Sequence, residues 1–188
     1  MTEGGIYMII NYDGSNFNGF QRQKDYRSVE QEVEKVLEII NKNKIRIIGA
    51  GRTDKGVHAL GQVFHFDCDL NITGERLKKA MNSLLPMDIY IKGVKAVDEE
   101  FHARYSSKSK LYRYRINVGE YNPIEANYVY QFNRKLDLDK MKKASKLFLG
   151  EHDFYNFCGY QELIDKNFIR RITSLEITQT NHYVNGHQ

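Results

Sequence analysis

The sequence predicts an α+β fold in which a ferredoxin-like β-α-β-β-α-β unit is followed by a second, incomplete α+β half. The first observation is the order of the apolar segments, because short β-branched and aromatic runs alternate with helix-length stripes. The second is the length of 188 residues, which suits one domain or two small ones. The third is that a similar order of strands and helices begins again after residue 100 and is not completed. We therefore expect an N-terminal half over 1–100 and a C-terminal half over 101–188.

The first half supplies all six elements of the expected unit. Residues 6–12 form a β-branched and aromatic run that ends at a turn signal, so they predict a strand. Ser28 is a candidate N-cap with Gln31 in the capping-box position, and an apolar helical stripe follows over 29–42. The other expected elements are strand 45–48, strand 62–66, a helix capped by Thr73 and stopped by Pro86, and strand 89–97.

The second half begins with similar elements and does not finish them. We expect a strand over 111–118, a helix over 138–149 and a strand over 171–178. A second copy of the unit would need a further strand, helix and strand. Residues 179–188 supply only a turn and at most the start of a strand. The second half is therefore expected to be truncated.

Composition excludes several classes of protein. Lys and Arg exceed Asp and Glu by 28 to 24, and 41% of the residues are hydrophobic, which fits a globular protein better than a disordered one. No apolar run approaches the ~20 residues of a membrane-spanning helix, and no signal peptide is expected. The two distant cysteines, Cys68 and Cys158, suit a reducing, cytoplasmic environment. The six histidines show no metal-ligand spacing, so we expect no metal site.

The loop over 49–59 is the most informative stretch for chemistry. It places Asp54 between Arg52 and Lys55 inside a segment flanked by glycines. Arg52 could pair with the Asp54 carboxylate and keep it ionised, and an ionised, positioned carboxylate can act as a nucleophile. An ordinary turn in which Asp54 caps the backbone is the alternative, since aspartates in glycine-rich loops commonly make turns.

A basic and aromatic stretch follows in the second half. Residues 101–119 hold five Lys or Arg and no acidic residue, and they include the run Tyr112-Arg113-Tyr114-Arg115. On a strand, the two tyrosines would share one face and could stack on RNA bases. Half-buried tyrosines in a strand are the alternative, which is the favoured one for Tyr114. The basic run over 140–146 is expected to be a solvated helix face.

The loop over 51–59 resembles the Gly-Arg-Thr-Asp-x-Gly-Val-His signature of the TruA-type tRNA pseudouridine synthases. Other stretches are similar to the motifs of that family in the same order along the chain. They are 12–23, 61–66, Asn82 with 85–89, 101–104, 112–114 and 150–157. The resemblance covers nearly the whole chain and implies the pseudouridine synthase fold.

The resemblance implies an isomerase that converts uridine to pseudouridine in the anticodon stem-loop of tRNA, at positions 38, 39 and 40. It implies that Asp54 is the nucleophile, that Arg52 orients Asp54 or the flipped nucleotide, and that Tyr112 packs against the target base. No cofactor or metal is implied, and family members act as homodimers on tRNA. We expect further RNA contacts from Arg22, Lys24, Arg104 and Lys110.

One departure from the family pattern leaves a second function open. The family continues beyond the strand near 171–178 into a Met-Val-Arg-containing helix, whose arginine pairs with the catalytic aspartate. This sequence ends before such a segment. A fragment that binds tRNA but is catalytically impaired is therefore the alternative to an active enzyme.

Overall fold

The computed structural model describes residues 5–67, 72, 74–158 and 167–180. The chain forms two compact units, one of Met1–Arg115 with Ile124–Tyr128 and the other of Ile116–Pro123 with Val129–Gln188. The first unit thus includes residues 101–115, which were expected to belong to the second half. The expected helix cap at Thr73 and most of the expected terminal turn over 179–188 lie outside the described residues.

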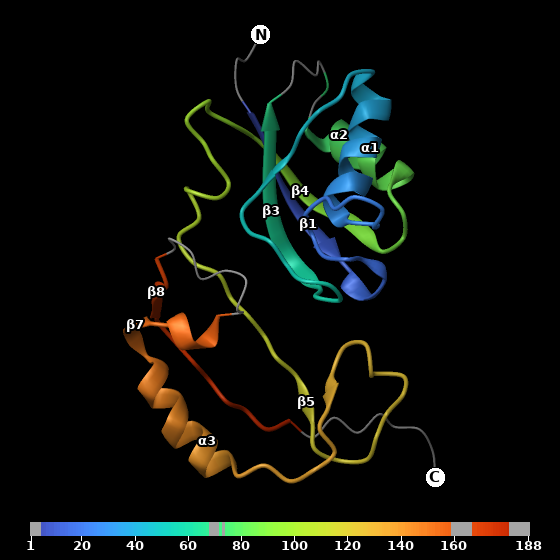
Figure 1. Ribbon diagram of the computed structural model, residues 1–188. Helices are drawn as coiled ribbons and strands as arrows, with labels where there is room; N and C mark the ends of the chain where they lie inside the picture. The colour runs from blue at the N-terminus through green and yellow to red at the C-terminus, as the bar shows by residue number, and fades with distance from the viewer. Residues whose placement is uncertain (1–4, 68–71, 73, 159–166, 181–188) are drawn as a thin grey trace. The chain divides into compact units, whose positions relative to one another are not determined.

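The first unit is a four-stranded antiparallel sheet with two helices on one side. The strands are hydrogen-bonded in the order β2-β3-β1-β4, and Figure 1 shows α1 and α2 together on the same side of the sheet. In chain order the elements are β1 (Gly5–Tyr12), the short 3-10 helix η1 (Gly14–Asn16), α1 (Val29–Asn41), β2 (Ile48–Gly49), β3 (Ala59–Asp67), α2 (Gly74–Leu84) and β4 (Ile89–Val97). This is the β-α-β-β-α-β order and confirms the predicted ferredoxin-like unit.

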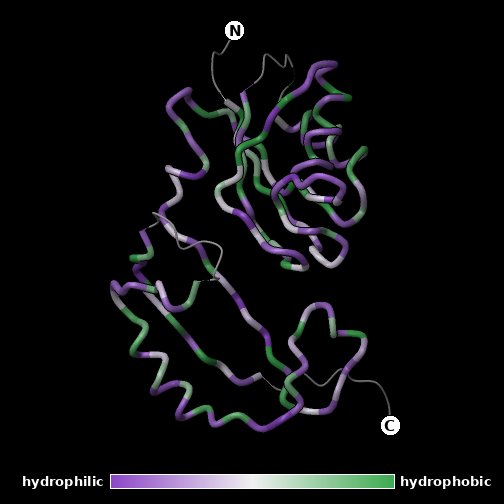
Figure 2. The backbone as a smooth tube through the Cα atoms, in the orientation of Figure 1, coloured by the Kyte–Doolittle hydropathy of each residue, from purple (hydrophilic) through white to green (hydrophobic). Residues whose placement is uncertain are grey.

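Helix α1 forms where local signals predict it. The Ser28 side chain accepts a hydrogen bond from the Gln31 backbone N–H, and the Gln31 side chain accepts one from the Ser28 N–H, which completes the capping box. The apolar stripe of α1 then packs on the sheet together with that of α2. Figure 2 shows hydrophobic and hydrophilic residues alternating along both helices, as expected for helices with one buried face. The core centres on fully buried side chains such as Met8, Phe64 and Leu77.

Strand β2 differs from the prediction over 45–48, because only Ile48 and Gly49 pair with β3. Ile45 and Ile47 are buried as the apolar pattern suggests. However, the Ile47 N–H donates to the Glu34 carboxylate of α1 at 3.0 Å. That N–H is therefore used by a helix side chain, which shortens this edge strand to two residues.

The second unit contains less regular structure than predicted. Its elements are β5 (Ile116–Asn117), β6 (Tyr130–Gln131), α3 (Leu138–Ser145), η2 (Lys146–Phe148), β7 (Gly150–Asp153), η3 (Tyr155–Phe157) and β8 (Ile169–Ile172). Strand β5 pairs with β6 in parallel, and β7 pairs with β8 antiparallel. The predicted helix is confirmed over α3, whose residues alternate between hydrophobic and hydrophilic in Figure 2.

Two strand predictions in the second half are wrong in extent. The strand expected over 111–118 is only Ile116–Asn117, because residues 111–115 pair with no described strand, and the Asn117 side chain ends the strand by accepting from the Gly119 N–H at 2.9 Å. The strand expected over 171–178 is Ile169–Ile172, the stretch that finds β7 as its partner. Residues 173–180 have no regular structure.

Candidate functional site

The loop that carries Asp54 connects β2 to β3 and is held by the segment after β1. The Tyr12 hydroxyl and the Thr53 hydroxyl are hydrogen-bonded at 2.8 Å, and burial raises the pKa of Tyr12 despite this bond. The Phe20 N–H donates to the Thr53 carbonyl at 3.0 Å, and the Gly56 N–H donates to the Phe17 carbonyl at 3.3 Å. These bonds on both sides of Asp54 fix the position of its backbone.

Glycine is required where the two loops touch. Gly19 has a φ of +93°, and a Cβ there would lie 2.6 Å from the Thr53 carbonyl oxygen, closer than real Cβ atoms approach. Only glycine combines this left-handed conformation with such a close approach. The loop after β1 is therefore shaped to receive the backbone next to Asp54.

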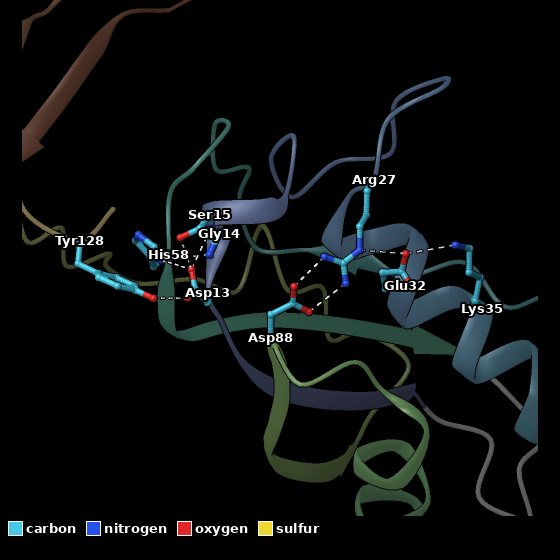
Figure 3. Close-up of polar contacts among 9 residues, drawn as sticks. All are labelled: Asp13, Gly14, Ser15, Arg27, Glu32, Lys35, His58, Asp88 and Tyr128. Atoms are coloured by element: carbon cyan, nitrogen blue, oxygen red, sulfur yellow. Dashed lines mark hydrogen bonds and ion pairs between the residues drawn. The ribbon is translucent and has the colours of Figure 1, made fainter. Parts of the chain in front are cut away.

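A polar cluster of Asp13, His58 and Tyr128 ties the far end of the Asp54 loop (Figure 3). The Tyr128 hydroxyl donates to the Asp13 carboxylate at 2.6 Å, and His58 Nδ1 lies 3.0 Å from the other Asp13 oxygen. The remaining ring nitrogen of His58 is 2.8 Å from the Asn127 carbonyl. Burial opposes ionisation of Asp13, but hydrogen bonds from Ser15 and Tyr128 and the nearby His58 lower its pKa to about 2.

A second polar cluster supports the loop after β1 from the opposite side. Arg27 forms a two-pronged ion pair with Asp88, at 2.7 and 3.0 Å, and also contacts Glu32 of α1 (Figure 3). The hydrogen bond with Asp88 raises the pKa of Arg27 further. The Arg27 guanidinium also lies 4.2 Å from the centre of the Phe17 ring. Phe17 is the residue whose carbonyl receives the Gly56 N–H, so Arg27 supports the Asp54 loop indirectly.

Asp54 itself is exposed, and its carboxylate has no partner within the described part of the chain. Among the described residues, Arg52 and Asp54 do not form the ion pair that the sequence allowed. The alternative, in which the Asp54 side chain caps a turn, is not observed either, since the Val57 N–H donates to the Asp54 backbone carbonyl at 3.2 Å. The backbone of the loop is thus held by hydrogen bonds, while the Asp54 carboxylate is exposed to solvent.

Three of the predicted basic residues gather beside this loop. Arg52 and Arg104 line a pocket of about 230 Å³. Lys110 lies against Gly51, where an added Cβ would be 2.8 Å from its ammonium nitrogen. These three residues come from separate stretches of the sequence and bring positive charge to the part of the loop around Gly51 and Arg52.

The other predicted binding residues are placed differently. Arg22 is ion-paired with the buried carboxylate of Glu34, which Arg46 also contacts. Lys24 lies in a tight exposed turn between Gln23 and Tyr26. Tyr112 is 80% exposed and lies in a stretch without regular structure, so the strand that should have presented it is not formed. Tyr114 is equally exposed, at 79%, which contradicts the half-buried interpretation.

Sequence reasoning missed the cluster of Asp13, His58 and Tyr128. The sequence marks Asp13 as part of the turn signal after residue 12 and of the motif stretch 12–23, but no local pattern marks Tyr128, which lies 115 positions from Asp13. Within the described ranges, no group of three or more His, Cys, Asp or Glu side chains could hold a metal ion. No helix in that part of the chain is long and apolar enough to cross a membrane.

Comparison with known proteins assigns a family to this chain. The family described as tRNA pseudouridine synthase matches residues 8–106, which include both loops of the site. Proteins named tRNA pseudouridine synthase A from Limosilactobacillus reuteri, Staphylococcus epidermidis and Pseudothermotoga lettingae are 46%, 43% and 50% identical to it. The matches cover 88%, 93% and 79% of this chain, which spans 66%, 66% and 61% of those proteins. The chain therefore belongs to the tRNA pseudouridine synthase family.

Proposed function

We propose that this chain isomerises uridine to pseudouridine in tRNA, with Asp54 as the nucleophile. The observation that carries the proposal is an exposed carboxylate without a partner among the described residues, on a loop whose backbone is fixed by Tyr12, Phe17 and Phe20. A nucleophile needs this combination, because it must be held in place and must also be open to the substrate.

The reaction rearranges one bond and needs no added reactant. The N1–C1′ bond of uridine breaks, the uracil turns, and C5 joins C1′. C5 then loses its proton and N1 gains one, so the product has the composition of the substrate. Attack of Asp54 on C1′, its attack on C6, and formation of a glycal each lead to this product. The chain's contribution in each case is a carboxylate placed beside the extruded nucleotide.

Binding of tRNA follows from the charges around the loop. The target uridine must leave the base stack to reach Asp54, which costs a few kcal/mol and less in a loop than in a duplex. Contacts from Arg52, Arg104 and Lys110 to phosphates would offset that cost. The family resemblance supports positions 38, 39 and 40 of the anticodon stem-loop as the substrate, a homodimer as the acting form, and the cytoplasm as the location.

A second function is favoured by one observation. No arginine pairs with Asp54 in the described part of the chain. A form that binds tRNA without converting it is therefore the alternative.

Tritium release from tRNA labelled at C5 of uridine tests the proposal, because C5 loses its hydrogen only when the new bond forms. We expect release by the chain and none by Asp54→Asn, which keeps the size of the side chain. Asp98→Asn, an exposed aspartate outside the site, is the matched control and should retain activity. Release that survives Asp54→Asn would contradict the role of Asp54. Stoichiometric tRNA binding without any release would select the alternative.

A further inference from the structure

A pocket of about 230 Å³ adjoins the Asp54 loop in the first unit. One wall is the edge strand β2 with Ile48 and Gly49, another is Arg52, and the third is a turn that carries Arg104 and Tyr105. The volume is below the roughly 300–1,000 Å³ typical of pockets for drug-sized ligands. The pocket therefore suits a single flat group, with polar extensions at its mouth.

The turn over 102–106 is built by histidine side chains. His102 Nδ1 accepts hydrogen bonds from the Arg104 N–H at 3.2 Å and the Tyr105 N–H at 3.4 Å. The Ser106 N–H donates to the His102 carbonyl at 2.8 Å, which closes the turn. The backbone on both sides of Arg104 is thus fixed.

A buried histidine on β3 anchors this turn to the sheet. His65 is 4% exposed, and its Nδ1 accepts from the Ala103 N–H at 3.2 Å. The centre of the His102 ring lies 5.0 Å from the centre of the His65 ring and 4.3 Å from the centre of the Tyr105 ring. Tyr105 therefore has a supported position and yet is 79% exposed. An exposed aromatic ring with a fixed backbone is a stacking surface for a base.

The charges at the pocket fit a nucleotide better than a free anion. Arg52 and Arg104 supply two cations, while Glu30 contributes one carboxylate to the lining. The Glu30 carboxylate accepts the Arg22 N–H at 2.6 Å, which fixes its position. A phosphate would lie between the arginines, and the attached base would lie toward Tyr105. A simple anion would gain little from the aromatic wall.

We propose that this pocket binds a nucleotide next to the target uridine, with its base stacked on Tyr105 and its phosphate between Arg52 and Arg104. The inference rests on the proposed function and deepens it. Arg52 lies two positions before Asp54, so a nucleotide held here is a neighbour of one held at the carboxylate. Holding a flanking nucleotide would help to keep the target base out of the stack and would contribute to site choice.

The test combines changes in the RNA with substitutions in the chain and measures the affinity of each pair. Binding of the full chain is measured by fluorescence anisotropy with a labelled anticodon stem-loop RNA and with two versions that are abasic directly 5′ or 3′ of the target uridine. Tyr105→Leu should weaken binding of the intact RNA about tenfold, the scale of one lost base stack, and Tyr105→Phe should bind normally. Tyr90→Leu, an exposed tyrosine on β4 outside the pocket, is the matched control.

The abasic RNAs separate stacking from a structural effect. One abasic RNA should bind the wild-type chain about tenfold more weakly than the intact RNA does. The same abasic RNA and the intact RNA should bind Tyr105→Leu equally well, because the stacking partner is already gone. Arg104→Gln should lower the salt dependence of binding by about one charge, and Arg76→Gln on α2 should show a smaller change. If both abasic RNAs lose the same affinity relative to the intact RNA, and lose it equally for the wild-type chain and for Tyr105→Leu, the pocket assignment is overturned.

The outcomes also distinguish this inference from the proposed function. Tritium release by the chain with no effect of Tyr105→Leu on binding would overturn the pocket and leave the function intact. Tyr105-dependent RNA binding without tritium release would support the pocket and remove the activity. Failure of the wild-type chain to bind the RNA at low salt would overturn both.

Discussion

Asp13 and Asp54 are two aspartates with opposite surroundings within one site. Asp13 accepts hydrogen bonds from the Ser15 N–H and hydroxyl and from Tyr128, and it faces His58. Asp54, four positions before His58, has an exposed carboxylate with no such partner in the described ranges. Asp13 therefore stabilises the loop, while the Asp54 carboxylate stays open to solvent. The division explains how a fixed backbone can carry an accessible carboxylate.

Asp13 should make stability depend on acid pH. Its pKa is about 2 in the folded chain, below the ordinary value of 3.8, so the ionised form stabilises the fold. That contribution is complete above about pH 5 and is lost progressively as the pH falls to about 2 and below. Urea unfolding between pH 2 and pH 5 should therefore show a steeper loss of stability for the wild-type chain than for Asp13→Asn. Asp25→Asn is the control, because Asp25 is exposed in a turn with a φ of 65° that asparagine tolerates. A wild-type slope equal to that of Asp13→Asn would contradict this role.

At the scale of elements, α1 does more than cover the sheet. Its buried Glu34 carboxylate is ion-paired with Arg22 and Arg46 and accepts the Ile47 N–H. It therefore connects the helix to the loop before it and to the start of β2. Arg22, one of the expected RNA contacts, is one of the two arginines paired with this carboxylate.

Replacing Glu34 should remove the connection between α1, the preceding loop and β2, and so lower stability. We expect Glu34→Gln to lower the free energy of unfolding by about 1–3 kcal/mol, because two arginines lose a buried charged partner. Glu38→Gln, one turn further along α1 and exposed, should change it by less than about 0.5 kcal/mol. Urea denaturation followed by circular dichroism measures both. Equal effects of the two substitutions would show that burial of Glu34 is unimportant.

The helices were predictable from sequence because their signals are local. The capping box of Ser28 and Gln31 and the stripe of α1 lie within a few positions of one another, and both are observed. Strands were less predictable because a strand exists only where a partner accepts its hydrogen bonds. Residues 45–47 and 111–115 have strand-like composition, yet they pair with no strand among the described residues. In the same way, the motif indicated Asp54, but no local pattern could indicate Tyr128.

At the scale of the whole molecule, the two units differ in how much they bury. The buried apolar cluster lies in the first unit, and α1 contributes five buried residues to that unit. Helix α3 has none among the residues that the structure describes. Backbone hydrogen bonds that are not covered by a core open more readily.

Hydrogen exchange should report this difference. We expect amides of α1, β1 and β3 to exchange much more slowly than those of α3. Leu77→Ala, which empties part of the core, should cost about 2–5 kcal/mol and speed exchange throughout the first unit. Leu147→Ala, at a residue 76% exposed, should cost less than about 0.5 kcal/mol. Protection of α3 that equals that of α1 would contradict the expectation.

The two-residue length of β2 has a consequence for association between chains. An unpaired strand edge can template pairing with another chain, and a strand of two residues offers too few groups to do so. The opposite edge of the sheet is β4, nine residues long and hydrogen-bonded only to β1 among the described strands. Lys92 and Lys95 lie on β4, and its register with β1 shifts between Ile9 and Ile10. Charge and irregular register, both of which discourage strand addition, thus occur on the edge that is long enough to aggregate.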